Sequence, residues 1–223
     1  MATTATMASR LALLIALLGS LGLSGCASLS GQQHSVRTTA EMHSYREQAQ
    51  VLEAQMDKAV ATLQAVVTAK DSNPAPNYEV FVRELANTDA QAQRVSDVAA
   101  ALKARAQAYF TAWESELAAI ANPEIRTRNE KRRGEVMTAF GKIDTAVGEQ
   151  QGALAKFLSD LHDLRKCFGT DLSPAGIGSV SDIVTKVDVD RTTVKDRIDA
   201  VRREIDSVFA TITVPTQAVG STN

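Results

Sequence analysis

Residues 177–212 read IGSVSDIVTKVDVDRTTVKDRIDAVRREIDSVFATI, and the hydrophobic pattern of this stretch decides the fold. Apolar side chains recur in alternating steps of three and four over eleven positions, of which only one is charged. The members of the stripe are Ile177, Val180, Val184, Val187, Arg191, Val194, Ile198, Val201, Ile205, Val208 and Ile212. A sustained 3.5-residue period is typical of helices that pack in a left-handed supercoil. We therefore expect a long helix that packs along its neighbours.

Three earlier segments carry similar three-and-four patterns and are bounded by prolines, which cannot continue a helix. Asn122 and Ser173 each precede a proline and are suited to cap the third and fourth helices. Since short connections make consecutive helices antiparallel neighbours, the sequence predicts an all-α fold. We expect an elongated antiparallel bundle of three or four long coiled-coil-like helices over residues 37–213. The predicted helices are about 37–70, 78–121, 123–168 and 174–212.

Composition agrees with a single elongated domain and argues against a nucleic acid as partner. Only 4% of the 223 residues are aromatic, which suits long helices packed by aliphatic side chains better than a compact core. The formal net charge is −2. A near-neutral chain gives no electrostatic reason to expect a nucleic acid as partner.

The N-terminus has the form of a secretory signal. Arg10 is followed by an apolar run from Leu11 to Leu23, which as a helix would cover roughly 20 Å, less than a membrane core requires. The run ends in Leu23-Ser24-Gly25-Cys26, which resembles the lipobox of bacterial lipoproteins. The resemblance implies a signal peptide over residues 1–25, cleavage before Cys26, and a diacylglyceryl and an N-acyl lipid on that cysteine. Two or three acyl chains would hold the protein stably on a bilayer.

The resemblance also implies a location. Ala27 follows the cysteine, where an aspartate commonly retains Gram-negative lipoproteins at the inner membrane. We therefore expect an outer-membrane anchor, with the chain facing the periplasm. Residues 26–36 are small and polar and are interpreted as a short tether, and residues 214–223 as a flexible tail.

The helical part resembles a family of uncharacterised bacterial proteins that is defined only as a domain of unknown function. The resemblance rests on YFTAWESEL at residues 109–117, on the basic start of the third helix, and on the long final helix. It covers about Arg37 to Ile212. This family implies no activity, catalytic residue or cofactor.

Two features of the predicted third helix are candidate sites. The first is a run of basic side chains near its start, which either binds an anionic partner or forms a solvated face paired with neighbouring acids. These side chains are Arg126, Arg128, Lys131, Arg132 and Arg133. The second is Cys167, the one thiol left once Cys26 is acylated. It is either a reactive or pairing thiol or a half-buried small residue.

Glycines are a third unusual feature of this helix. Gly134, Gly141 and Gly148 recur at intervals of seven, and Gly152 follows. Each costs about 1 kcal/mol relative to alanine inside a helix. They either allow another helix, for example from a second copy, to approach closely, or form a tolerated loose face.

Catalytic and metal-binding patterns are absent from the sequence. His34, His43 and His162 have no paired spacing, and no Glu-x-x-His motif surrounds them. The segment from Asp188 to Asp199 only faintly resembles a calcium loop, because it lacks the required glycine and terminal glutamate. We expect no enzymatic activity and no cofactor beyond the lipid. The leading hypothesis is a structural or docking lipoprotein that binds envelope proteins or self-associates, and the alternative is a module that binds a small ligand, lipid or cell-wall fragment.

Overall fold

The structure is a computed structural model that describes residues 31–212 of the chain. The predicted signal peptide, the predicted lipidation site Cys26 and the predicted tail at 214–223 lie outside the described residues. Within residues 31–212 there are five helices and no strand. The helices are α1 (Gly31–Thr68), α2 (Ala75–Ala118), α3 (Pro123–Thr170), the short α4 (Pro174–Gly178) and α5 (Ser181–Ile212).

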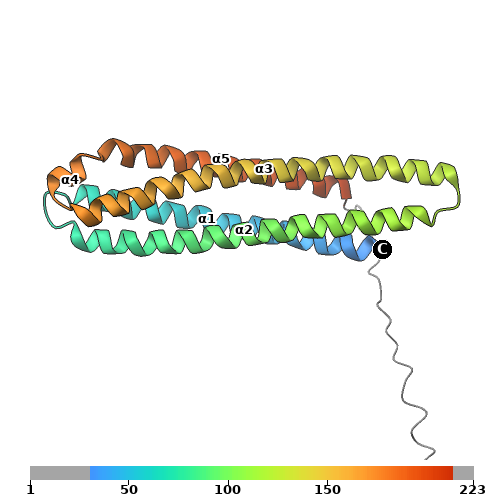
Figure 1. Ribbon diagram of the computed structural model, residues 1–223, viewed down its shortest axis with the longest axis horizontal. Coiled ribbons are helices and arrows are strands. Elements are labelled where there is room, and N and C mark those ends of the chain that lie inside the picture. The colour runs from blue at the N-terminus through green and yellow to red at the C-terminus, as the bar shows by residue number, and fades with distance from the viewer. Residues whose placement is uncertain (1–30, 213–223) are drawn as a thin grey trace, which may run out of the picture.

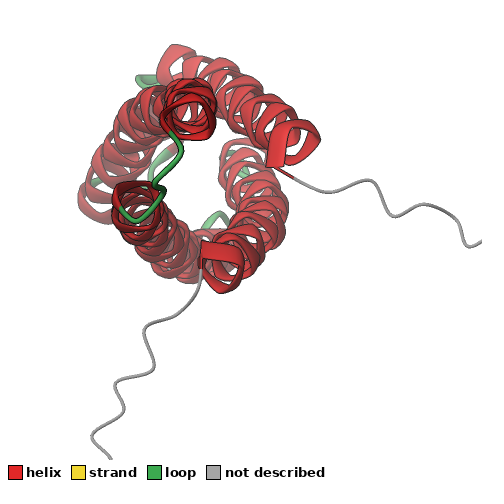
Figure 2. Cartoon of the chain, turned by 90° about the vertical axis from the view of Figure 1, so that its right-hand side faces the viewer, coloured by secondary structure: helices red, strands yellow, loops and turns green. Residues whose placement is uncertain are grey.

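The four long helices lie side by side and form a rod (Figure 1). Viewed along the axis, they occupy four corners (Figure 2). α1 packs most extensively against α2, and α3 packs against α5; α2 with α3 and α1 with α5 close the ring. The all-α antiparallel bundle is thus confirmed, with four helices rather than three around the core. At ~1.5 Å per residue, the longest helix, α3, spans roughly 70 Å.

The core consists of the apolar stripes that the sequence displays. In α5 every apolar member of the stripe from Val184 to Val208 is buried, which confirms the 3.5-residue pattern. Near the end of α2, Phe110 and Leu117 are buried, whereas Tyr109 and Trp113 are only partly buried. Fully buried side chains from all four long helices, Leu52, Phe81, Phe157 and Ile198 among them, belong to one continuous cluster.

α1 begins six residues earlier than predicted, so the polar tether expected over residues 26–36 is wrong for residues 31–36. The Gly31 amide donates to Glu116 Oε1 at 2.7 Å, and the Thr38 hydroxyl donates to the His34 carbonyl at 2.8 Å. Thr38 is fully buried. Adding a turn to an existing helix costs little, so these contacts suffice to extend it where the sequence shows no apolar periodicity.

The predicted fourth helix is divided into α4 and α5. The Ser179 hydroxyl donates to the Gly176 carbonyl at 2.7 Å, which competes with the helical hydrogen bonds. A Cβ on Gly176 would lie 2.6 Å from the Asp171 carbonyl oxygen, so the turn that precedes it requires glycine there. Ile177 and Val184 keep their three-and-four spacing across the break and both remain buried, so the hydrophobic stripe does not reveal it.

The predicted helix caps are confirmed. The Asn122 side chain accepts from the amides of Glu124 and Ile125 at 2.9 and 3.3 Å, and the Ser173 hydroxyl accepts from the Gly176 amide at 3.1 Å. α2 begins three residues before its predicted start and ends three before its predicted end. α3 continues through Gly169 to Thr170 rather than ending at 168.

The two ends of the rod are built differently. The start of α1, the end of α5 and the α2–α3 turn lie at one end, and the α1–α2 turn and α4 lie at the other (Figure 1). We call the first the anchor end, after the lipid anchor predicted at Cys26, and the second the far end. No helix within residues 31–212 combines the length and the apolar character that a membrane crossing needs.

Candidate docking surfaces of the rod

The start of α1 is fixed against the end of α2. Besides accepting from the Gly31 amide, the Glu116 carboxylate lies within 2.8 Å of where a Cβ on Gly31 would be. This position admits only a glycine without rearrangement of that side chain. Cys26, the predicted lipidation site, lies outside the described residues, but it precedes this fixed point by only five positions.

The predicted basic patch divides into two groups. Arg132 donates to the Thr211 carbonyl at the end of α5, and Arg133 pairs with Glu114 of α2 at 2.9 Å. These two arginines therefore tie the start of α3 to its neighbours. Arg128 pairs with Glu124 one turn away, on the exposed surface. The side chains of the remaining members, Arg126 and Lys131, have no hydrogen bond or ion pair to any described residue.

The glycines of α3 do not contact another helix of the rod. Gly134, Gly141, Gly148 and Gly152 are all exposed, and a Cβ on any of them would meet nothing within 4 Å. Close approach of a helix from the same chain is therefore excluded as their explanation. Approach by a second copy stays a prediction.

A mostly apolar groove runs between α2 and α3. Its volume is about 320 Å³. Phe110 and Phe140 meet edge to face at 5.4 Å in its wall, and a salt bridge from Lys103 to Asp144 at 2.9 Å joins the two helices beside it. Small side chains create the space, and they are Ala99, Ala106 and Gly141. These small residues leave a hollow between the two helices instead of bringing them closer together.

Two buried glutamines lie between the helices with opposite hydrogen-bonding states. Gln91 Nε2 donates to the Gln48 carbonyl at 2.9 Å, and its Oε1 accepts from Arg94 Nε at 2.7 Å. Gln150 is fully buried, and neither atom of its amide has a partner in the described chain. The hydroxyl of Tyr45 is also buried without a partner, and burial raises its pKa.

Arg191, the charged member of the α5 stripe, is paired with acidic side chains. Its guanidinium pairs with Asp57 of α1 and with Asp188 of α5, each at 2.8 Å. Lys195 also pairs with Asp57. Arg191 therefore lies at the edge of the core and joins α1 to α5, which explains how a charge is tolerated within the stripe.

Salt bridges likewise join α3 to α5. Lys186 Nζ donates to Asp160 at 2.9 Å, and Lys156 pairs with Asp190. The hydrogen bond from Lys186 lowers the pKa of Asp160, and the hydrogen bond to Asp190 raises the pKa of Lys156. These groups stabilise each other's charged forms, as a structural network does.

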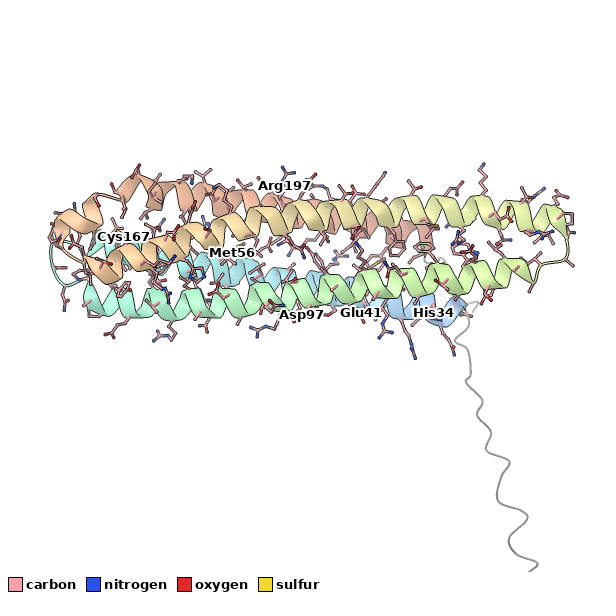
Figure 3. The ribbon with its side chains drawn as sticks, in the orientation of Figure 1. His34, Glu41, Met56, Asp97, Cys167 and Arg197 are labelled. Atoms are coloured by element: carbon pink, nitrogen blue, oxygen red, sulfur yellow. The ribbon has the colours of Figure 1, made fainter. Side chains whose placement is uncertain are left out.

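The histidines and acidic residues do not converge. His43 stacks on Phe209 with ring centroids 4.8 Å apart, and His162 Nε2 lies 3.0 Å from Asp89 Oδ1. His34 lies near the anchor end, as Figure 3 shows. Asp188 and Asp190 lie on a continuous helix rather than in a loop. In the part of the chain described, no three His, Cys, Asp or Glu side chains are grouped to hold a metal.

Cys167 lies near the far end, in the last turn of α3 (Figure 3). It is half-buried and forms no disulfide. Nearby, the Tyr78 hydroxyl donates to the Arg165 carbonyl at 3.0 Å. It lies so close to Gly169 that a Cβ there would be only 2.8 Å from the hydroxyl oxygen. This contact joins the start of α2 to the end of α3.

Residues 33–212 match the family described as protein of unknown function, DUF2959. The match covers most of the chain, so the chain belongs to this family, and the resemblance to an uncharacterised family is confirmed. The match begins four residues before the range expected from the sequence, which agrees with the early start of α1. Comparison with curated proteins and with solved structures finds no match.

Proposed function

We propose that this member of the DUF2959 family is a lipid-anchored helical rod of the bacterial envelope, which docks other envelope proteins at a set distance from the membrane. The observation that supports the proposal most strongly is the start of α1 at Gly31, only five residues after Cys26, at one end of the rod. A lipid on Cys26 would hold this end near the bilayer. The far end would then stand up to about 70 Å away.

Further support comes from how the rod is stiffened. Ion pairs link α1 to α5 and α3 to α5, and a single core cluster runs through the four long helices. A stiff rod of this kind is suited to hold a bound protein at a fixed distance from the membrane. We assign it to the outer membrane on the strength of Ala27, facing the periplasm, and without enzymatic activity.

Replacing Cys26 with serine is expected to move the protein from the membrane fraction to the aqueous periplasmic fraction, because serine cannot form the thioether that carries the lipid. Cell fractionation and mass spectrometry of the N-terminus measure this. Cys167→Ser is the matched control and should stay with the membrane. A Cys26→Ser protein that remained fully membrane-bound would contradict the anchor.

Docking is tested by photo-cross-linking in intact cells. Val51 and Val189 are 51% and 61% exposed, so a photoreactive residue at either position leaves the core intact. We expect specific envelope proteins to be captured in the anchored chain and to be lost in the Cys26→Ser background. Capture of only lipid or glycan would count against docking.

A second candidate function, binding of a small apolar ligand, is favoured by the groove between α2 and α3. Its volume falls at the lower end of the range of ligand sites. Replacing Ala106 with tryptophan should fill it and reduce binding of the apolar dye N-phenylnaphthylamine at least about tenfold. Ala100→Trp, on an exposed face of the same helix, is the control. Equal dye binding by both variants would rule the groove out.

A further inference from the structure

The anchor end carries a projection that the proposed function does not use. We call it the anchor-end tip and define it as residues 119–131, the α2–α3 turn and the first nine residues of α3. It extends past the start of α1 and past the end of α5 (Figure 1). Arg132, just behind it, contacts Thr211 at the end of α5, and Glu116 contacts Gly31 at the start of α1.

The tip carries basic side chains that the fold does not use. Of its charged groups, Arg128 and Glu124 pair with each other. Arg126, Lys131 and Glu130 have no ion pair within residues 31–212, which leaves a positive surplus. Arg126, the fourth residue of α3, lies near the positive end of the helix dipole, and Lys131, the ninth, lies beyond its reach, so the dipole stabilises neither cation. Cations that pair with no acid within residues 31–212 are available to an external anion.

An apolar side chain accompanies these cations. Ile125 is 49% exposed on the first turn of α3, and Ile120 in the turn before it is half-buried. Apolar side chains flanked by basic ones are typical of surfaces that rest in the headgroup region of a membrane, where the apolar part enters the acyl boundary and the cations meet phosphates.

Geometry selects the membrane as the partner. Cys26 and Gly31 are separated by five residue steps, which reach at most about 18 Å when fully extended. The nine residues of α3 in the tip extend about 13 Å beyond the level of Arg132. A lipid on Cys26 would therefore hold the tip close to the bilayer surface, because the connection to α1 is short and the tip extends past the start of α1.

We propose that the anchor-end tip contacts anionic lipid headgroups of the membrane that holds Cys26, through Arg126, Arg128 and Lys131, with Ile125 inserted between them. This inference rests on the proposed lipid anchor. The contact gives the rod a second point of attachment, which fixes its tilt and so the height of the far end. Guanidinium and ammonium groups both bind phosphate, and the arginines can do so with two parallel hydrogen bonds.

The test uses the full lipidated chain in vesicles of brominated phosphatidylcholine, with or without phosphatidylglycerol. Trp113 is replaced by phenylalanine, and one tryptophan is placed either at the tip (Ile125→Trp) or at the far end (Ser72→Trp). Bromine quenches tryptophan only at close range. We expect the tip tryptophan to be quenched, more strongly with phosphatidylglycerol, and the far-end tryptophan to be unaffected.

Charge removal separates this contact from the anchor. Each basic side chain near an anionic surface strengthens attachment about fivefold. Arg126→Gln with Lys131→Gln should therefore remove most of the gain from phosphatidylglycerol, while the chain still floats with the vesicles. The control, Lys70→Gln with Lys166→Gln, removes two charges toward the far end and should change nothing.

The outcomes distinguish the two proposals. Flotation with an unquenched tip tryptophan would overturn the tip contact and leave the anchor standing, and would point to a protein as the partner of the basic side chains. Absence of flotation would overturn both. If the tryptophan variants fold poorly, hydrogen exchange of the unsubstituted chain tests the same contact. We expect exchange at residues 119–131 to be slower on anionic vesicles, and unchanged exchange there would overturn the tip contact.

Discussion

Replacing Phe157 with alanine is expected to lower the free energy of unfolding by about 3–5 kcal/mol. Phe157 is fully buried on α3 within the continuous core. The cost combines the lost burial of the ring with the cavity that a rigid bundle cannot close. For a domain of this size the melting temperature should fall by about 6–20 °C. Urea titration and thermal unfolding followed by circular dichroism measure both.

Val189→Ala is the matched control, because Val189 is 61% exposed on α5. Alanine has the higher helix propensity, so this variant should be neutral or slightly more stable. A Phe157→Ala protein as stable as the Val189→Ala control would show that the core is not packed around this ring. Unfolding in two separate steps would show that α3 and α5 do not unfold together with α1 and α2.

Replacing Gln150 with leucine is expected to raise the free energy of unfolding by about 1–3 kcal/mol. The amide of Gln150 is buried and neither of its atoms has a partner in the described chain, so the folded state bears the cost of removing it from water. Leucine has a similar size and lacks that cost. The same urea titration measures the change.

The second buried glutamine is the control and should give the opposite sign. Gln91→Leu removes hydrogen bonds to Gln48 and Arg94 and should lower the free energy of unfolding by about 1–2 kcal/mol. If both variants were destabilised equally, the amide of Gln150 would have to form hydrogen bonds in solution. If Gln150→Leu were stable but of mixed oligomeric state, its role would be to specify the register of packing, as single buried polar residues do in coiled coils.

The candidate surfaces were only partly predictable from sequence. The run of basic residues was visible in the sequence. Which of them pair within the rod was not, because the partners of Arg132 and Arg133 come from α5 and α2. The groove was missed, although the small side chains at positions 99 and 106 were its signal. Small residues on a helix permit either close packing or a hollow, and the path of the neighbouring helix decides between the two.

The sequence by itself determined the helical class and nearly every buried position. A 3.5-residue apolar period and proline-bounded segments are local properties, and local backbone geometry turns them into helices and faces. It also determined the caps at Asn122 and Ser173, since each is a short-range hydrogen bond within one turn.

Only the tertiary structure decided where α1 begins and which charges are left for a partner. The early start depends on Glu116, 85 positions away from Gly31. Whether a charge is free depends on acids that lie on other helices. These are non-local contacts, and a period read along one helix contains no information about the groups its neighbours bring to it.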